Sequence, residues 1–334
     1  MRLRTPAAWL VLPFASLAAT AVTSCDALAF CRTMACPLPA GFAPSPDACV
    51  PPDFASWCAS QTPPDKPIPI WWRNACVSYD LQQNASQQAP YATADTMFAA
   101  AFGKWTSLDC AGPAGPGGSS RVSIDVRDLG PVACDQVQYN QTQGNQHVII
   151  FHDHSWPHDD QLNTLGLTTI TYDPDTGEIY DADMEINATV PLALRDPVPT
   201  GSYDLQSIIT HECGHFLGMA HSGDMNATMY AFYTMGATSM RTLTADDIGG
   251  LCSIYPPSGE RAVDPSVAAG GGVGQDACDP TPRHGFSAQC ASGASGGCDA
   301  TGGGGSRDRD GLALTILAVS AWGGARRRRR GCAT

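Results

Sequence analysis

Apolar and polar positions follow two periods between residues 71 and 257. Alternation with a period of two, or a short apolar run, predicts a β-strand. Five segments show such a pattern, at residues 75–81, 121–128, 147–151, 167–172 and 178–186. A turn-forming sequence, Asp173-Pro174-Asp175-Thr176-Gly177, predicts that the last two strands are joined by a tight connection.

Apolar residues at helical spacing predict three helices in the same region. The first is expected to begin at a Thr93 cap, and the second near Ser202 or Asp204. The third follows a sequence that resembles a capping box, Thr244-Ala245-Asp246-Asp247, and must end before Pro256. Two apolar stripes indicate helix faces that are buried in a core. They consist of Met97, Phe98, Ala101, Phe102 and Trp105 on the first helix, and of Leu205, Ile209, Cys213 and Phe216 on the second.

The second predicted helix carries the pattern H-E-x-x-H-x-x-G-x-x-H. His211 and His215 are four residues apart, so both imidazoles project from one face of a helix and can bind one zinc ion. Glu212 is too close in sequence to share the metal and instead reaches a water bound to it. Gly218 is expected to end the helix, because glycine adopts a positive φ without steric cost. The resulting turn brings His221 back as a third ligand.

Three protein ligands with a fourth position open to water are typical of catalytic rather than structural zinc. A bare H-E-x-x-H also arises by chance in surface helices, but the extended pattern specifies five positions. The pattern therefore predicts a metal-dependent hydrolase.

Composition restricts the partners and the compartment. The chain has 334 residues and a formal net charge of -13. Seven of its 19 Lys and Arg residues lie in the terminal segments, so the rest of the chain is more acidic still. This charge argues against nucleic acid as the partner. The 14 cysteines predict disulfides and an oxidising compartment. Their spacing does not specify the pairing. Because Cys213 and Cys252 lie on the second and third predicted helices, we expect those two to pair.

The first 29 residues have a basic start, an apolar run and the sequence Ala27-Leu28-Ala29, which is typical of a secretory signal peptide. Val22-Thr23-Ser24-Cys25 also resembles a lipobox, which would make Cys25 a lipidated N-terminus. The well-formed small-residue site favours cleavage after Ala29. Residues 30–66 are rich in Pro and Cys and predict a small disulfide-stapled segment, with purely structural cysteines favoured over a thiolate that binds the zinc for latency.

The C-terminal region divides into two parts. Residues 258–310 are rich in Gly, Ser and Cys, which predicts a flexible linker, stapled locally by Cys278, Cys290 and Cys298. Residues 311–334 comprise an apolar run followed by five arginines. As a helix, the run of about 15 residues would rise only about 22 Å, less than the roughly 30 Å of a bilayer core. The arginines would hold that end on the cytoplasmic side during export. A transmembrane or surface anchor is therefore one interpretation of this segment.

Two further segments contain residue types that bind metals. The His- and Asp-rich loop at residues 152–160 supplies ligands for a second, structural ion, although the pattern favours a solvated loop. Asp173, Asp175, Asp181 and Asp183 supply oxygen ligands that suit calcium, and solvated carboxylates in a plain turn are the alternative.

Residues 71–257 resemble the matrixin branch of the metzincin zinc proteases. The resemblance rests on the histidine pattern followed by Ser222, on Met229 at the position of the Met-turn methionine, and on residues 229–234 and 243–248. It implies an α+β metzincin fold, in which a twisted, mixed, five-stranded sheet and three main helices place zinc at the floor of a cleft. The family's cysteine-switch motif and its structural-zinc pattern do not occur here. The C-terminal end has three parts, namely Gly297-Cys298, the apolar run from Gly311 to Ala325 and the five arginines, and this arrangement resembles the sorting signal of exported myxobacterial proteins.

Together these features predict a secreted or surface-anchored zinc endopeptidase whose catalytic domain comprises residues 67–257. Its partners would be protein or peptide substrates, and we expect a monomer. Glu212 would act as general base, and Met229 would form an apolar floor under the ligands. Substrate would add as a strand to a sheet edge, for which residues 178–186 are the candidate. The alternative is a catalytically weak, zinc-containing surface-binding module, against which the intact Glu212 argues.

Overall fold

The computed structural model describes residues 34–35, 68–112, 114–158, 163–173, 176–260, 278–291 and 313–321. The expected signal peptide, lipobox and arginine tail lie outside these residues, as does Asp175. Most of the Cys- and Pro-rich segment 30–66 also lies outside them.

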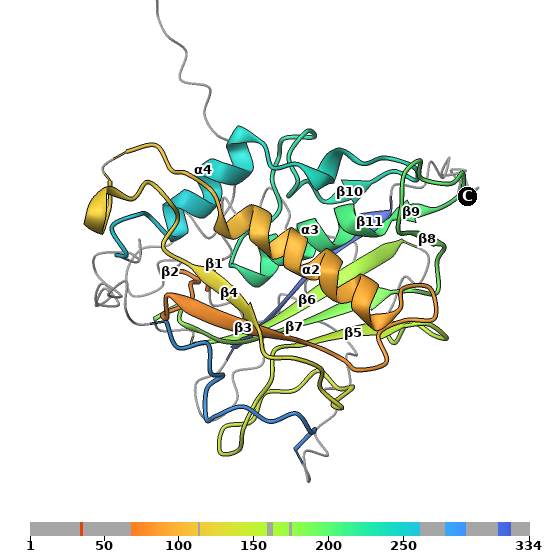
Figure 1. The fold of residues 1–334 in the computed structure, drawn as a ribbon, viewed down its shortest axis with the longest axis horizontal. Coiled ribbons are helices and arrows are strands. Elements are labelled where there is room, and N and C mark those ends of the chain that lie inside the picture. The colour runs from red at the N-terminus through yellow and green to blue at the C-terminus, as the bar shows by residue number, and fades with distance from the viewer. Residues whose placement is uncertain are drawn as a thin grey trace, which may run out of the picture.

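A seven-stranded mixed sheet forms the centre of the molecule (Figure 1), with the order β10-β11-β6-β7-β5-β3-β4. The five strands expected from the sequence pattern are all present. They are β3 (Cys76–Leu81), β4 (Asp125–Asp128), β5 (Val148–His152), β6 (Thr164–Tyr172) and β7 (Ile179–Asn187). Strands β4, β3, β5 and β7 run parallel, and β6 is antiparallel to β7.

Two strands extend the sheet beyond β6. Strand β11 (Ala313–Ala321) pairs antiparallel with β6, and β10 (Phe232–Tyr233) pairs parallel with β11. Two small sheets lie outside the main one: β1 (Met34–Ala35) with β2 (Ile68–Pro69), and β8 (Leu192–Ala193) with β9 (Tyr203–Asp204). Short 3-10 turns occupy Pro116–Gly118 and Ser239–Arg241.

Strand β7 is not an edge of the sheet, so the prediction that residues 178–186 receive the substrate is wrong. Strand β6 is antiparallel to β7, with Gly177 N donating to Asp173 O between them, and β5 pairs with the other side of β7. The outermost of the five predicted strands are therefore β6 and β4, and β11 pairs with the outer side of β6. Alternating polarity indicates which face of the sheet a residue occupies, but not which strands lie next to each other. The sequence pattern therefore did not indicate which strand lies at the edge.

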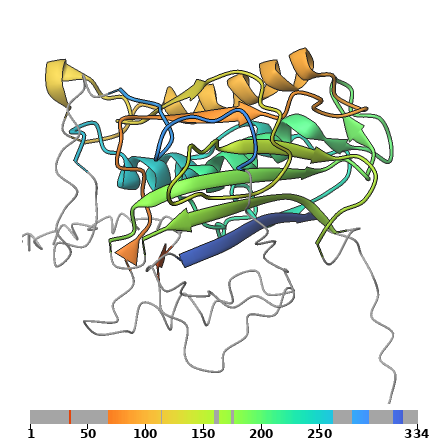
Figure 2. The ribbon, with the colours of Figure 1, turned by 90° about the horizontal axis from the view of Figure 1, so that it is seen from below.

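Helices α2 (Tyr91–Thr106) and α3 (Leu205–Phe216) lie side by side across one face of the sheet, with α4 (Ala245–Ile254) beyond them (Figures 1 and 2). Every residue of the two predicted apolar stripes is buried. Helix α2 begins before the expected Thr93 cap, because the carbonyl of Pro90 already accepts hydrogen bonds from the backbone of Thr93 and Ala94. Proline suits a helix start, since its φ is close to helical and the N–H that it lacks would have no partner there.

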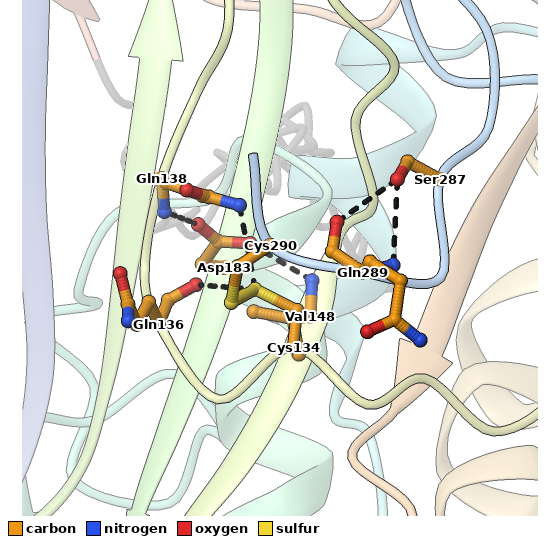
Figure 3. Close-up of a disulfide and its surroundings, with 8 residues drawn as sticks. All are labelled: Cys134, Gln136, Gln138, Val148, Asp183, Ser287, Gln289 and Cys290. Carbon is orange, nitrogen blue, oxygen red and sulfur yellow. Dashed lines mark hydrogen bonds between the residues drawn. A yellow bond between two sulfur atoms is a disulfide. The ribbon is translucent and has the colours of Figure 1, made fainter. Parts of the chain in front are cut away.

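The other face of the sheet is covered by two segments far apart in sequence. The polar residues of β7 point to this face, and Asp181 and Asp183 are buried there. Residues 133–147 and 278–291 lie over them, joined by the Cys134–Cys290 disulfide and by the hydrogen bond from Ala133 N to Ala288 O. Figure 3 shows this disulfide beside the Asp183 carboxylate. Burial on both faces explains why polar alternation in β7 does not mean exposure.

Three long-range disulfides connect the described residues: Cys76–Cys278, Cys110–Cys252 and Cys134–Cys290. The predicted Cys213–Cys252 bond is wrong. Cys213 is a free thiol fully buried between α3 and the rest of the core, whereas Cys252 bonds Cys110, just beyond the end of α2. Local stapling is also wrong for Cys278 and Cys290, because both bond the sheet domain. Cys298 lies outside the described residues.

Among the described residues, no helix is long and apolar enough to cross a membrane. The central part of the apolar run that was considered as an anchor is strand β11.

Candidate metal centre

Three imidazoles converge at the C-terminal half of α3 and the turn that follows it. The Nε2 atoms of His211 and His215 are 3.0 Å apart, and those of His215 and His221 are 3.2 Å apart. Within the described part of the chain, this is the one group of three or more His, Cys, Asp or Glu residues whose ligand atoms all lie within 4.8 Å of one another. Sequence positions 211, 215 and 221 thus form a single site.

Backbone carbonyls orient two of these rings. The Nδ1 of His211 lies 2.7 Å from the Thr228 carbonyl oxygen, and the Nδ1 of His215 lies 2.8 Å from that of Met219. A neutral imidazole that donates from Nδ1 carries a lone pair on Nε2, so both rings present lone pairs to the centre of the site.

The surroundings also keep these rings neutral. Burial, followed by the neighbouring His221, lowers the pKa of His211 to about 3. Burial, together with His211 and His221, lowers the pKa of His215 well below its ordinary value. A neutral imidazole is the form that binds a metal.

The donor set fits zinc. Two nitrogens that each lie about 2.0–2.1 Å from one tetrahedral zinc are about 3.3 Å apart, close to the 3.0 and 3.2 Å separations here. Three imidazole nitrogens leave one tetrahedral position for another ligand. His211, His215 and His221 would therefore hold the ion.

The local fold explains why the sequence forms this site. Asp204 caps α3 as expected, because its carboxylate accepts from the backbone N–H of Ser207 at 2.9 Å. The helix ends at Phe216, and Gly218 has a φ of +92°. A Cβ at Gly218 would lie 3.1 Å from the carbonyl oxygen of Ile70, so the turn is both strained and crowded for any other residue. This turn carries the chain to His221.

The Glu212 carboxylate is held by β6, a contact that the sequence did not reveal. Thr168 Oγ1 donates to Glu212 Oε2 at 2.6 Å. A Cβ built at Gly166 would lie 2.6 Å from Glu212 Oε1 and 2.8 Å from its Cγ. Thr168 and Gly166 are two apart on a strand, so they face the same side. Gly166 lies one residue before the predicted strand at residues 167–172, and a glycine in a strand often marks a close approach of another group. The sequence pattern did not include it in the strand, so this signal was missed.

Met229 explains the glycine in the middle of the zinc-site helix. Met229 is fully buried, and a Cβ at Gly214 would lie 2.3 Å from its sulfur and 2.8 Å from Cζ2 of Trp105. Glycine costs about 1 kcal/mol relative to alanine inside a helix. Here Met229 and Trp105 occupy the space that a side chain at position 214 would fill.

Asp247 links the third helix to the site. It completes the capping box that was predicted from Thr244. In addition, its carboxylate accepts from the backbone N–H groups of Thr228 at 2.9 Å and Met229 at 3.0 Å. The Thr228 carbonyl is the group that orients His211. The sequence indicated the cap but not this second contact, which joins residues distant in the chain.

The His-rich loop is not a simple solvated loop. His152 Nε2 and His158 Nε2 lie 2.7 and 2.8 Å from the two carboxylate oxygens of Glu185, and Trp156 is buried between neighbouring rings. Burial would raise the pKa of Glu185, but the two imidazoles outweigh it and lower that pKa. The loop is therefore tied to β7 by ion pairs.

Two of the four expected calcium ligands, Asp173 and Asp183, have hydrogen-bond partners within the chain. Asp183 accepts from the backbone N–H groups of Gln138 and Val148 (Figure 3), and Asp173 accepts from Tyr180 Oη and Thr176 N. Oxygens engaged in this way suit the attachment of loops to the sheet better than a calcium site, which needs six to eight free oxygen ligands.

Comparison with known proteins agrees with this geometry. Residues 132–256 match the model of the matrixin family. The chain is 32% identical to human matrix metalloproteinase-16 over 146 residues, which cover 41% of this chain and 23% of that protein. It is 38% identical to human neutrophil collagenase over 78 residues, which cover 20% of this chain and 17% of the collagenase. It is 23% identical to Arabidopsis thaliana metalloendoproteinase 1-MMP over 199 residues, which cover 58% of this chain and 46% of that protein. The aligned part thus spans less than half of each of these relatives.

Proposed function

Because this chain contains a matrixin-like metzincin domain, we propose that it is a zinc-dependent endopeptidase that acts outside the cytoplasm. One observation carries the proposal. The imidazoles of His211, His215 and His221 bring their Nε2 atoms close together, and those of His211 and His215 are kept neutral. The carboxylate of Glu212 lies on the same helix as these two histidines.

The proposed reaction is hydrolysis of a peptide bond. His211, His215 and His221 would hold a zinc ion, which when bound would polarise the scissile carbonyl and lower the pKa of a water. Glu212 accepts the proton of the attacking water and passes it to the leaving amine. Thr168 holds one oxygen of this carboxylate, and Gly166 leaves room for it. Met229 forms the apolar floor beneath the ligands.

The peptide would bind in extended form along β6. This strand is the outer edge of the five-stranded core, and it carries the two residues that contact Glu212. Main-chain hydrogen bonds to an exposed edge bind peptides with little dependence on their sequence. The edge of β6 beside Glu212, called the peptide groove below, is therefore suited to protein or unfolded peptide substrates.

Substitution of the base tests the mechanism. Glu212→Ala should retain one zinc per chain while the cleavage of a mixed peptide library falls by a factor of at least about 10². Glu260→Ala, which changes an exposed glutamate, is the matched control. A zinc chelator should abolish the activity of the control variant. Undiminished turnover by Glu212→Ala would refute the assignment, and zinc retention without turnover in every form would instead favour a binding module.

Export is part of the proposal. Three disulfides of long sequence separation form and persist in an oxidising compartment. The predicted signal sequence agrees with them. Surface anchoring through the C-terminus and a monomeric state are predictions from the sequence alone. Fractionation of the producing cells would locate the protein, and recovery from the cytoplasm would contradict export.

A further inference from the structure

The edge that would receive a peptide is paired with a segment of the chain itself. Strand β11 (Ala313–Ala321) lies antiparallel to β6 over most of its length, from Ala313 opposite Tyr172 to Ser320 opposite Thr164. Its other side pairs with β10, where Phe232 lies opposite Ser320. Figures 1 and 2 show β11, in blue, beyond β6 on the side away from β7.

The register places β11 in front of the proposed base. Gly166 and Thr168 are the β6 residues that contact Glu212. Their partners in β11 are Val319 and Leu317. The backbone of β11 therefore runs beside β6 at the position where the scissile part of a substrate would need to lie.

We propose that residues 313–321 are a built-in occupant of the peptide groove, which excludes other peptides until the C-terminal segment is released. This inference rests on the proposed function, because it assigns a regulatory role to the same groove. Strand addition requires main-chain N–H groups, and residues 311–325 contain no proline and no charged residue.

The tether makes such an occupant effective even if it binds weakly. Residues 292–312, which number 21, connect β11 to the segment that is fixed by the Cys134–Cys290 disulfide. A short tether holds a segment at an effective concentration of about 1 mM. A segment with an intrinsic Kd of about 0.1 mM would then leave the groove open in roughly one molecule in ten.

Release of the segment tests the proposal. A recognition site for a specific protease is inserted between Gly303 and Gly304 of the full chain, and turnover of a peptide substrate is compared before and after nicking at submicromolar protein. Nicking should raise turnover about tenfold. A synthetic peptide of residues 311–323 should reverse the gain by raising KM without lowering kcat, and a scrambled peptide of the same composition should not.

A point variant provides an independent measurement. Leu317→Pro in the unnicked chain should raise turnover as nicking does, because proline removes a main-chain donor and distorts the strand. Ala325→Pro, beyond the strand, is the matched control and should leave turnover unchanged. Equal turnover before and after nicking, with no competition by the peptide, would overturn the proposal.

Binding separates this inference from the proposed function. A fluorescent peptide of residues 311–323 is titrated into the nicked Glu212→Ala protein after removal of the C-terminal fragment. Saturable binding that the unnicked protein does not show supports occupancy of the groove whether or not any form cleaves peptides. Absence of binding refutes it even if the enzyme is active.

Discussion

At the residue scale, the position of Glu212 is determined by two small features of a neighbouring strand. Thr168 contributes one hydroxyl, and Gly166 contributes the absence of a side chain. Neither residue carries catalytic chemistry itself. Both are positioning residues, because they decide where a carboxylate on a different element can lie.

Gly166→Ala should therefore impair the reaction without removing the metal. The new Cβ would lie 2.6 Å from Glu212 Oε1 and must displace that carboxylate. A shift of about 1 Å in a reacting group costs up to about 10² in rate, so we expect kcat to fall 10- to 100-fold. Zinc content, measured by atomic absorption, should stay at one per chain.

Gly103→Ala is the matched control for this change, since a Cβ at Gly103 meets nothing within 4 Å and alanine favours the helix. A Gly166→Ala protein with wild-type kcat would show that Glu212 tolerates the displacement and would contradict the assignment.

At the scale of elements, the site depends on contacts between segments that the chain keeps far apart. Helix α3 provides two histidines of the proposed metal centre, the turn after it provides the third, and α4 holds the Met229 region through Asp247. The Cys110–Cys252 bond ties α4 to the segment that follows α2 across 142 residues. This disulfide therefore fixes the element that supports the floor of the site.

Replacement of both cysteines, Cys110→Ser with Cys252→Ser, should lower the free energy of unfolding by about 2–5 kcal/mol, as for other native disulfides. Urea denaturation of the two proteins measures the difference. Cys213→Ala, which removes a buried thiol outside any disulfide, should cost about 1 kcal/mol. Peptide mapping without reduction should recover Cys110 linked to Cys252, and recovery of a Cys213–Cys252 peptide would contradict the fold described above.

At the scale of the whole molecule, acidic residues are enclosed between the sheet and the two segments that cover its outer face. Asp80, Asp181 and Asp183 are all buried there. Burial, followed by the neighbouring Asp183, raises the pKa of Asp181 well above its ordinary value. Burial also raises the pKa of Asp80 from 3.8 to about 7, although the backbone N–H of His147 opposes the shift. The folded protein therefore favours the protonated form of Asp80.

The raised pKa of Asp80 makes the stability of the fold depend on pH in one direction. A carboxyl group whose pKa is higher in the folded state stabilises the fold fully below pH 3.8, and that contribution is lost as the pH rises through about 7. Asp80→Asn keeps an acceptor but cannot ionise. The free energy of unfolding of Asp80→Asn, relative to that of the wild type, should be about 2 kcal/mol higher at pH 8 than at pH 5. Urea unfolding of the zinc-free proteins at both pH values measures this difference.

The exposed Asp135→Asn provides the matched comparison for the Asp80 variant. If the stability advantage of Asp80→Asn were the same at both pH values, Asp80 would not be the group that loses its proton in this range.

The sequence by itself determined the features that depend on neighbours in the chain. The four-residue spacing of His211 and His215, the positive φ required at Gly218 and the Asp204 cap are local geometry. The periods of two and 3.6 residues likewise predicted the five core strands and three helices, because side-chain direction repeats with the backbone. The resemblance to matrixins extended this to the fold, with which the match over residues 132–256 agrees.

Only the tertiary structure decided which distant segments meet. The partner of Cys252, the contact of Thr168 with Glu212, and the place of β6 rather than β7 at the edge follow from how elements pack. The same is true of β11, whose apolar sequence suits a membrane anchor as well as a strand. Contacts between segments depend on complementary shapes and on main-chain pairing, and neither produces a periodic pattern of residue types in the sequence.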